Sequence, residues 1–294
     1  MTTALSPRGD LQSPNRSARH AAAMFVSFAA IVLLATQLEP VVPPYHPQLR
    51  APIGWMLAAS SAGLALLLVL RPVTHRAVLL AAGWFVLLAA LFQGFVVGDL
   101  IAMFGTWLVV PGLALVAGQL RPRPRKALVA AHAVAAAAWV GIGVTLVAMA
   151  VVAMATDDVS AAHAIYEMMA TFDVTLLPWA NFATVLTGLA LSFATKWGLI
   201  RHYWVIAKAV VAVGILVMAF GFLHDELEGV VDQTAALAAT GGTAAQPWGG
   251  AGVVLWGFVC AGLGLVAAML LSLYKPGGRT RFATARPASR GRTP

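Results

Sequence analysis

Charged side chains are scarce in this chain, where Asp, Glu, Lys and Arg together make up 10% of the residues and hydrophobic residues make up 60%. A water-soluble domain has about 25% charged residues because water must wet its surface. The low charge content therefore excludes a soluble globular protein and predicts that lipid solvates most of the surface. The basic residues that give the net charge of +8 lie in short loops between apolar runs. This placement indicates membrane orientation and excludes nucleic acid as a partner, since nucleic-acid binding needs a basic stripe on one folded face.

Cysteine is nearly absent, because Cys260 is the single one in the chain. One cysteine excludes an intrachain disulfide and any Cys-x-x-Cys site for zinc or redox chemistry. The sequence also lacks a Gly-x-Ser-x-Gly nucleophile elbow, a glycine-rich phosphate loop and a His-Glu-x-x-His zinc helix. These absences favour a protein that is not an enzyme, and we assign no catalytic residue.

Long apolar runs dominate the rest of the chain. A helix needs about 20 apolar residues to cross a hydrocarbon layer about 30 Å thick. Eight runs approach or exceed this length, at about residues 21–38, 53–70, 77–97, 100–120, 127–155, 174–195, 203–223 and 250–273. The sequence therefore predicts an all-α polytopic membrane helix bundle of about eight transmembrane helices, with both termini on one side.

The charges between the runs indicate which side that is. Basic residues precede the first run, join runs two and three, four and five, and six and seven, and follow the eighth. The positive-inside rule makes this face cytoplasmic. Every acidic residue except Asp10 falls on the opposite face, where Arg50 is the single basic residue. We expect a multi-pass protein of the bacterial inner membrane with both termini in the cytoplasm.

The basic, proline-containing segment Arg121–Lys126 separates two groups of four spans. Alternating proline predicts an extended link at this point. The predicted organisation is a disordered cytoplasmic arm over 1–20, a first four-helix membrane group over 21–120, the linker over 121–126, a second four-helix bundle over 127–275 and a disordered basic tail over 276–294.

Two further segments are expected on the outer face. Residues 157–172 repeat apolar side chains at helical spacing, which predicts an amphipathic helix lying on the membrane surface. Residues 230–249 begin acidic, become rich in Ala, Thr and Gly, and end at Gln246-Pro247-Trp248. We expect an outer loop there.

Two histidine–glutamate pairs on the outer face are candidate metal ligands. His163 and Glu167 are four residues apart, as are His224 and Glu228, so each pair shares one face of a helix. Imidazole and carboxylate groups suit a divalent metal such as Zn²⁺ or Cu²⁺, or a non-haem iron. An ordinary acidic outer loop gives the same pattern, and both interpretations stay open.

Ionisable residues also lie within two of the runs. His132 and Lys208 each lie between one and two turns from the cytoplasmic end of a span, where a titratable group usually faces a bundle interior, a cavity or a cofactor. His132 is a candidate axial ligand of haem b, with His202 as its partner. The alternative is a neutral histidine that is hydrogen-bonded within the bundle. We expect the Lys208 ammonium to reach the headgroups.

The sixth run carries a series of polar residues. Asp173 stands at its outer end, Asn181 and Thr184 lie further along one face, and Pro178 frees a backbone carbonyl. With Lys208 these residues form a predicted polar path through the bundle. An ordinary interhelical seam with a kink is the alternative.

Short motifs in the C-terminal half connect it to known families. They are His132, Trp139-Val140-Gly141, Thr187-Gly188-Leu189, Lys196-Trp197-Gly198, Trp204 and Lys208. On these residues the half resembles a bacterial family of predicted integral membrane proteins of unknown function, and it is distantly similar to the membrane domain of copper-resistance D proteins. The resemblance implies a four-helix membrane bundle and the handling of metal or haem, and it transfers no catalytic residue.

Three functions are compatible with these features. The first is the binding or passage of a metal ion, haem or small solute through the C-terminal bundle. The second is a structural or assembly role beside a membrane protein partner, and the third is a membrane redox protein that contains haem b. The lipid bilayer is the expected partner in all three.

Overall fold

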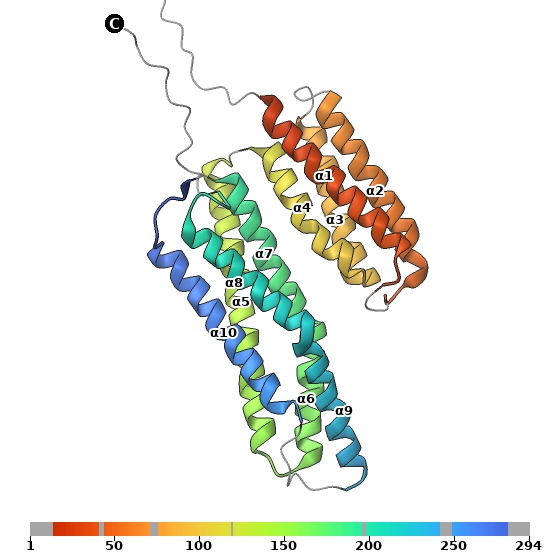
Figure 1. The fold of residues 1–294 in the computed structure, drawn as a ribbon, viewed down its shortest axis with the longest axis vertical. Coiled ribbons are helices and arrows are strands. Elements are labelled where there is room, and N and C mark those ends of the chain that lie inside the picture. The colour runs from red at the N-terminus through yellow and green to blue at the C-terminus, as the bar shows by residue number, and fades with distance from the viewer. Residues whose placement is uncertain are drawn as a thin grey trace, which may run out of the picture. The chain divides into compact units, whose positions relative to one another are not determined.

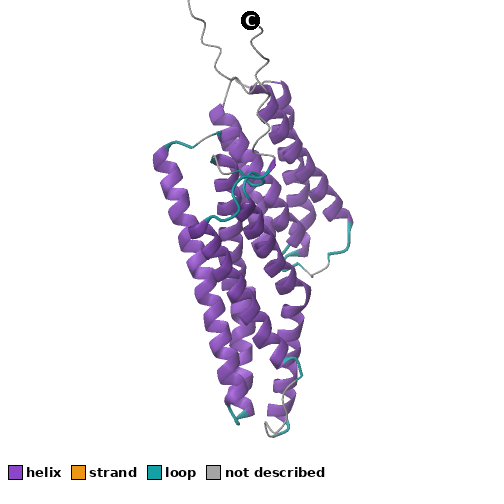
Figure 2. Ribbon diagram, turned by 60° about the vertical axis from the view of Figure 1, so that its left-hand side comes forward, coloured by secondary structure: helices purple, strands orange, loops and turns teal. Residues whose placement is uncertain are grey.

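The structure is a computed structural model that describes residues 14–40, 44–70, 76–118, 120–195, 198–241 and 249–281. These residues are helical almost throughout, as Figures 1 and 2 show. Over the described ranges the β-structure is limited to an isolated bridge between His202 and Arg279. Eight helical stretches are long and apolar enough to cross a membrane. The predicted all-α polytopic fold with eight spans is confirmed.

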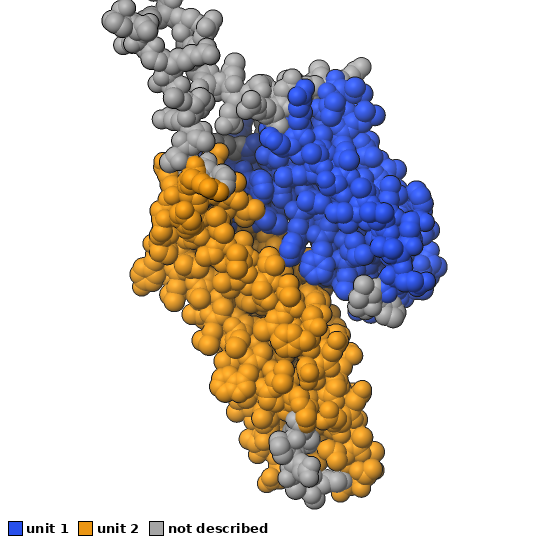
Figure 3. All heavy atoms as spheres, in the orientation of Figure 1, with its two compact units in different colours: residues 1–122, 189–196 blue, residues 123–188, 197–294 orange. Residues whose placement is uncertain are grey.

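The chain divides into two compact units, which Figure 3 draws in different colours. Unit 1 comprises Met1–Pro122 and Leu189–Lys196, and unit 2 comprises Arg123–Gly188 and Trp197–Pro294. The first boundary falls inside the segment that the sequence predicts to be a linker.

Unit 1 contains four helices and a short π-helix. They are α1 (Pro14–Gln37), α2 (Pro47–Leu70), α3 (Arg76–Phe92), η1 (Gln93–Val97) and α4 (Leu100–Ala117). Helix α1 packs on α2 and α4, and α3 packs on the same two helices. Phe25 and Phe28 are fully buried between them. A Cβ atom on Gly105 would lie 2.7 Å from the Phe28 ring, so only glycine lets that ring rest on α4. Close approach at a small residue is a common way for helices to pack in lipid.

Unit 2 contains most of the remaining helical residues. The remaining helices are drawn from yellow-green to blue in Figure 1. They are α5 (Pro122–Ala155), α6 (Val159–Val174), α7 (Leu176–Ala194), α8 (Tyr203–Met218), the π-helix η2 (Ala219–Leu223), α9 (His224–Ala239) and α10 (Ala251–Tyr274). Leu189–Ala194 at the end of α7 and Pro122 at the start of α5 belong to unit 1. Helix α6 packs along α9, and α10 packs along α8. Trp139, Leu146, Tyr166 and Phe258 are among the residues that form one continuous buried core.

Three helical stretches of unit 2 are longer than a bilayer requires. Pro122–Ala155, Val159–Ala194 and Tyr203–Ala239 contain 34, 36 and 37 residues. At 1.5 Å per residue each extends for about 50 Å, against a hydrocarbon layer of about 30 Å. Part of each stretch therefore extends beyond the hydrocarbon.

Two predictions about the segments expected in the cytoplasm differ from the structure. The expected arm over 1–20 is helical from Pro14 onward, and its first 13 residues lie outside the described ranges. The expectation of an extended linker is wrong, because Pro122–Lys126 form the start of α5. The first four N–H groups of a helix have no partner within it, so proline at the first and third positions removes no hydrogen bond.

The outer segments also differ from expectation. Residues 159–174 are helical, as predicted, but α6 packs on α9 through Val159, Ala162, Tyr166 and Met169 rather than lying alone on a surface. The loop predicted over 230–249 is wrong for its first half, since α9 continues to Ala239. The motif Gln246-Pro247-Trp248 and the tail after Arg281 lie outside the described residues.

Candidate functional site

The polar side chains predicted along the sixth run meet partners from other helices of unit 2. Asp173, at the end of α6, faces His224 at the start of α9, and the Asp173 Oδ2 atom is 2.7 Å from His224 Nδ1. On the other side of the ring, His224 Nε2 is 3.5 Å from Glu228 Oε1. Both ring nitrogens of His224 therefore face carboxylates, an arrangement that stabilises a protonated imidazole. This pair links the α6–α7 stretch to α9.

His163 lies apart from that pair. Its Nδ1 atom is 3.1 Å from Thr234 Oγ1, and the Thr234 hydroxyl donates to the Val230 carbonyl at 2.8 Å. Since the hydroxyl proton is used in that bond, His163 Nδ1 acts as the donor to Thr234. This contact joins α6 to α9, whereas Glu167 is exposed on α6.

The predicted metal ligands are thus only partly brought together. His224 and Glu228 are adjacent, while His163 is occupied by Thr234. Over the ranges that the structure describes, no three His, Cys, Asp or Glu side chains are arranged to hold a metal ion. Metal binding by His163, Glu167, His224 and Glu228 stays a prediction.

His132 is fixed in place by α7. Its Nδ1 atom is 3.0 Å from the Thr184 carbonyl oxygen and 3.0 Å from Thr187 Oγ1. The Thr187 hydroxyl donates to the Ala183 carbonyl at 2.5 Å, so the imidazole Nδ1–H donates to Thr184 O and Nε2 carries the lone pair. The ring also lies against Gly188, where an added Cβ would be 3.2 Å from His132 Cε1.

The two histidines predicted to bind haem have different surroundings. His202 stands just before α8, with its ring centroid 6.4 Å from that of Trp204. His132 instead takes its hydrogen bonds from α7. These hydrogen bonds agree with the alternative interpretation, in which His132 is a histidine hydrogen-bonded within the bundle. A haem bound by both His132 and His202 stays a prediction.

Asn181 and Lys208 are the two remaining residues of the predicted polar path, which stays a prediction. The Asn181 side chain is buried, with 3% of the residue exposed, and its Oδ1 atom has no hydrogen-bond partner. Lys208 Nζ is 2.6 Å from Ser272 Oγ near the end of α10, with the Trp204 ring centroid 6.0 Å away. Lys208 therefore extends toward that end of the bundle.

Along the α6–α7 stretch these groups form a series that we call the polar row: Asp173 with His224, then Asn181, then Thr184 and Thr187 with His132. Asp173 and Asn181 are eight residues apart, or about 12 Å along a helix, and Thr187 is about 9 Å further on. The row thus extends over about 20 Å within unit 2, and its members come from α5, α6, α7 and α9.

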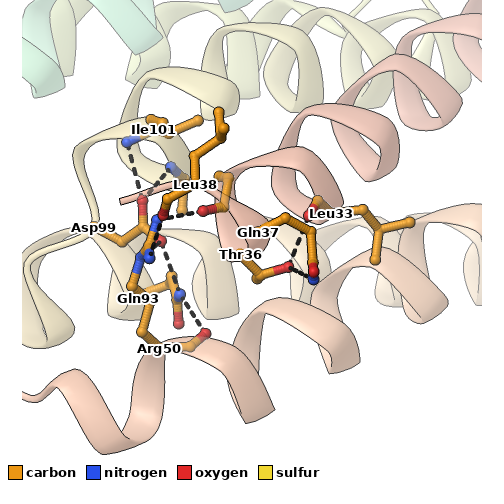
Figure 4. Close-up of polar contacts among 10 residues, drawn as sticks. Leu33, Thr36, Gln37, Leu38, Arg50, Gln93, Asp99 and Ile101 are labelled. Atoms are coloured by element: carbon orange, nitrogen blue, oxygen red, sulfur yellow. Dashed lines mark hydrogen bonds and ion pairs between the residues drawn. The ribbon is translucent and has the colours of Figure 1, made fainter. Parts of the chain in front are cut away.

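Unit 1 contains a polar cluster that the sequence did not reveal, shown in Figure 4. Arg50 Nε is 3.3 Å from Asp99 Oδ2, and Gln93 Nε2 donates to the same oxygen at 3.2 Å and to the Arg50 carbonyl at 2.9 Å. The Arg50 guanidinium also donates to the Leu38 carbonyl at 3.0 Å and to the Ala35 carbonyl. This Arg50–Asp99 clamp therefore joins the ends of α1, α2, η1 and α4.

Asp99 also begins α4. Its Oδ1 atom accepts hydrogen bonds from the backbone N–H groups of Ile101 and Ala102, at 3.1 and 3.2 Å. These are the free donors at a helix start that an aspartate cap satisfies. The three nitrogens of the Arg50 guanidinium each donate to an oxygen atom, of Asp99, Leu38 or Ala35, so the clamp has a structural role. The sequence signal was available, since Arg50 is the single basic residue among acidic outer loops.

Comparison with known proteins gives no relative for this chain. No family model, no curated protein and no solved structure matches it. The fold and the polar row are therefore the basis for inference. The resemblance to copper-resistance D proteins stays a prediction.

Proposed function

We propose that this integral membrane protein binds and passes a small polar solute through unit 2, along the polar row. The observation that carries the proposal is the row itself, in which the Thr184 carbonyl and the Thr187 hydroxyl contact His132 of α5 and the buried Asn181 side chain lies between that contact and the Asp173–His224 pair. Polar side chains inside a membrane bundle are costly, and several on one face are typical of a solute path.

The proposed setting is the bacterial inner membrane, with both termini in the cytoplasm. The basic loops support this orientation through the positive-inside rule. If the hydrocarbon begins at Tyr203, the helix Tyr203–Leu223 crosses about 31 Å. The acidic helix α9 then lies outside the hydrocarbon, and the row leads inward from His224 toward His132.

A small solute agrees with this site better than the other cargoes do. A metal ion needs several ligands at once, while the nitrogens of His224 face carboxylates and His163 is bound to Thr234. A haem b redox protein would bind the haem iron through His132 Nε2 and would need a second axial ligand. A small polar solute needs only the hydrogen-bonding groups that the row already offers.

The second candidate is a structural or assembly subunit of a membrane complex. An apolar groove of about 410 Å³ between α5 and α6 favours it, with Met149, Val152, Ile165 and Met168 among its lining residues. An apolar helix of a membrane partner would fit such a surface. In this candidate the polar row would be an ordinary interhelical seam.

Reconstitution into liposomes tests the proposal. Vesicles that contain the pH dye pyranine or a Zn²⁺ dye report the entry of either species after a concentration jump. We expect at least one of the two species to enter faster than it enters empty vesicles, and we expect this entry to be lost in His132→Leu and Thr187→Val. Thr145→Val is the matched control, because this exposed threonine donates only to the Gly141 carbonyl of its own helix.

Two measurements on the same preparation decide between the candidates. A Soret absorption band would favour the haem protein, and stoichiometric bound metal would favour the metal site. Entry equal to that of empty vesicles, together with a stable membrane partner recovered in mild detergent, would contradict passage and favour the assembly role.

A further inference from the structure

Asn181 lines a small cavity in the core of unit 2. The cavity offers about 20 Å³ to the centres of water molecules, and Trp139, Gly143, Leu223 and Phe258 are among its lining residues. By the same measure one water needs about 10–15 Å³. The cavity therefore has room for one water and is too small for a hydrated ion.

The chemistry of the lining is nearly all apolar. Asn181 and Trp139 are the only residues of the lining with a side-chain nitrogen or oxygen. Since an indole only donates hydrogen bonds, Asn181 Oδ1 is the one side-chain oxygen acceptor there. A dehydrated Zn²⁺ needs about four ligands and Ca²⁺ about six to eight, so this lining does not suit a metal ion.

Asn181 Oδ1 has no hydrogen-bond partner, although the residue is only 3% exposed. A buried acceptor left without a donor destabilises a protein by about 1–3 kcal/mol. A water molecule in the cavity would supply that donor. Buried polar groups that have no protein partner are usually satisfied in this way.

The backbone beside the cavity is irregular. Met218, Ala219 and Leu223 line it, and Ala219–Leu223 is the π-helix η2. A π-helix carries one extra residue per turn, which displaces the helical ladder, and such bulges are frequent at functional sites. The unpartnered Asn181 Oδ1 atom and the irregular helix thus occur at the same cavity.

We propose that this cavity is a hydration site in which one water donates to Asn181 Oδ1, and that the species passing along the polar row is the proton. The second part rests on the proposed function. The cavity at this level of the row has room for one water, while the imidazoles of His224 and His132 contact Asp173 and Thr184 further along the row and do not line the cavity. The proposed relay reaches the two imidazoles through further waters. Each water accepts one proton and releases another, so each is regenerated and no oxidant or reductant is needed.

Radiolytic footprinting of the full chain in detergent tests the hydration site. A pulse of X-rays makes hydroxyl radicals from bound water, and these oxidise the nearest reactive side chain. Trp139 lines the cavity and is 3% exposed, whereas Met169 is fully buried in the same core and is not part of that lining. We expect Trp139 to be oxidised well above Met169 in the wild type.

Two substitutions of Asn181 make this result specific. Asn181→Leu keeps a similar volume and removes the acceptor, so Trp139 oxidation should fall to the level of Met169. Asn181→Ser keeps a hydroxyl acceptor and should retain the oxidation. A Trp139 that is protected in the wild type, or oxidised equally in Asn181→Leu, would overturn the hydration site.

Vesicle measurements test the proton and separate this inference from the proposed function. We expect pyranine to report proton entry that Asn181→Leu abolishes, with no Zn²⁺ entry in the wild type. Zn²⁺ entry, or proton entry that His132→Leu stops and Asn181→Leu leaves unchanged, would overturn the proton path but not passage through unit 2. Wild-type vesicles that match empty ones would contradict the proposed function and the proton path together, while the footprint would still decide the hydration site.

Discussion

The Arg50–Asp99 clamp gives a quantitative prediction about unit 1. The side chains of Arg50 and Asp99 are only 11% and 4% exposed. Asp99→Asn keeps the Oδ1 cap of α4 but replaces the charged Oδ2 atom, which faces Arg50 Nε and Gln93 Nε2, with an amide group. Removing one partner of a buried ion pair costs about 3–5 kcal/mol. Arg50 keeps its two carbonyl partners, so we expect a loss of about 3 kcal/mol in the free energy of unfolding.

Reversible unfolding in mixed detergent micelles, followed by circular dichroism, measures this loss. Asp99→Ala also removes the helix cap, which adds about 1 kcal/mol. Glu39→Gln is the matched control, because it removes an exposed carboxylate, and we expect a change within about 0.5 kcal/mol. The double variant Arg50→Met with Asp99→Leu should be milder than Asp99→Asn, since it leaves no buried charge. A loss for Asp99→Asn as small as that for Glu39→Gln would refute the clamp.

Two further predictions concern packing and local stability. Gly105→Ala should destabilise unit 1 by about 1–3 kcal/mol in the same assay, because its Cβ would lie 2.7 Å from the Phe28 ring. Gly63→Ala is the control, because it faces open space and should be neutral or stabilising. Equal effects of the two substitutions would contradict the close approach of Gly105 to Phe28. His224→Ala should raise amide hydrogen exchange at the start of α9, because it removes the 2.7 Å contact with Asp173. Glu228→Gln, at a side chain that is 63% exposed, should change that exchange little, and unchanged exchange in His224→Ala would show that the contact does not hold α9.

The eight spans were predictable because span length and charge placement are local properties of the sequence. The continuation of α9 to Ala239 was not, because the polar residues over 230–249 predict a loop. Polarity ends the membrane-embedded part of a helix, but Leu227, Val230 and Thr234 continue the helical period and are buried. A helix stabilised by packing continues into water when its residues favour it.

The contacts at the candidate sites depend on tertiary packing and could be predicted only in part. The sequence placed Asp173, Asn181 and Thr184 on one path, but not the partners His224 and His132, which lie 51 and 52 residues from the groups that they contact. The Arg50–Asp99 pair joins residues 49 apart. The charge pattern predicts that Arg50 and Asp99 lie on the same face of the membrane. The packing of α1, α2 and α4 brings the two side chains into contact.

Passage through unit 2 requires the polar row to connect two faces of a membrane, with the basic loops on one face and helix α9 on the other. Single cysteines at Arg123 and Glu226, each in a Cys260→Ala background, test it by labelling intact cells with a membrane-impermeant maleimide. We expect the cysteine at Glu226 to react from outside the inner membrane and the one at Arg123 to react only after the membrane is opened. Labelling of both from the same side would contradict the account, because the row would then begin and end on one face.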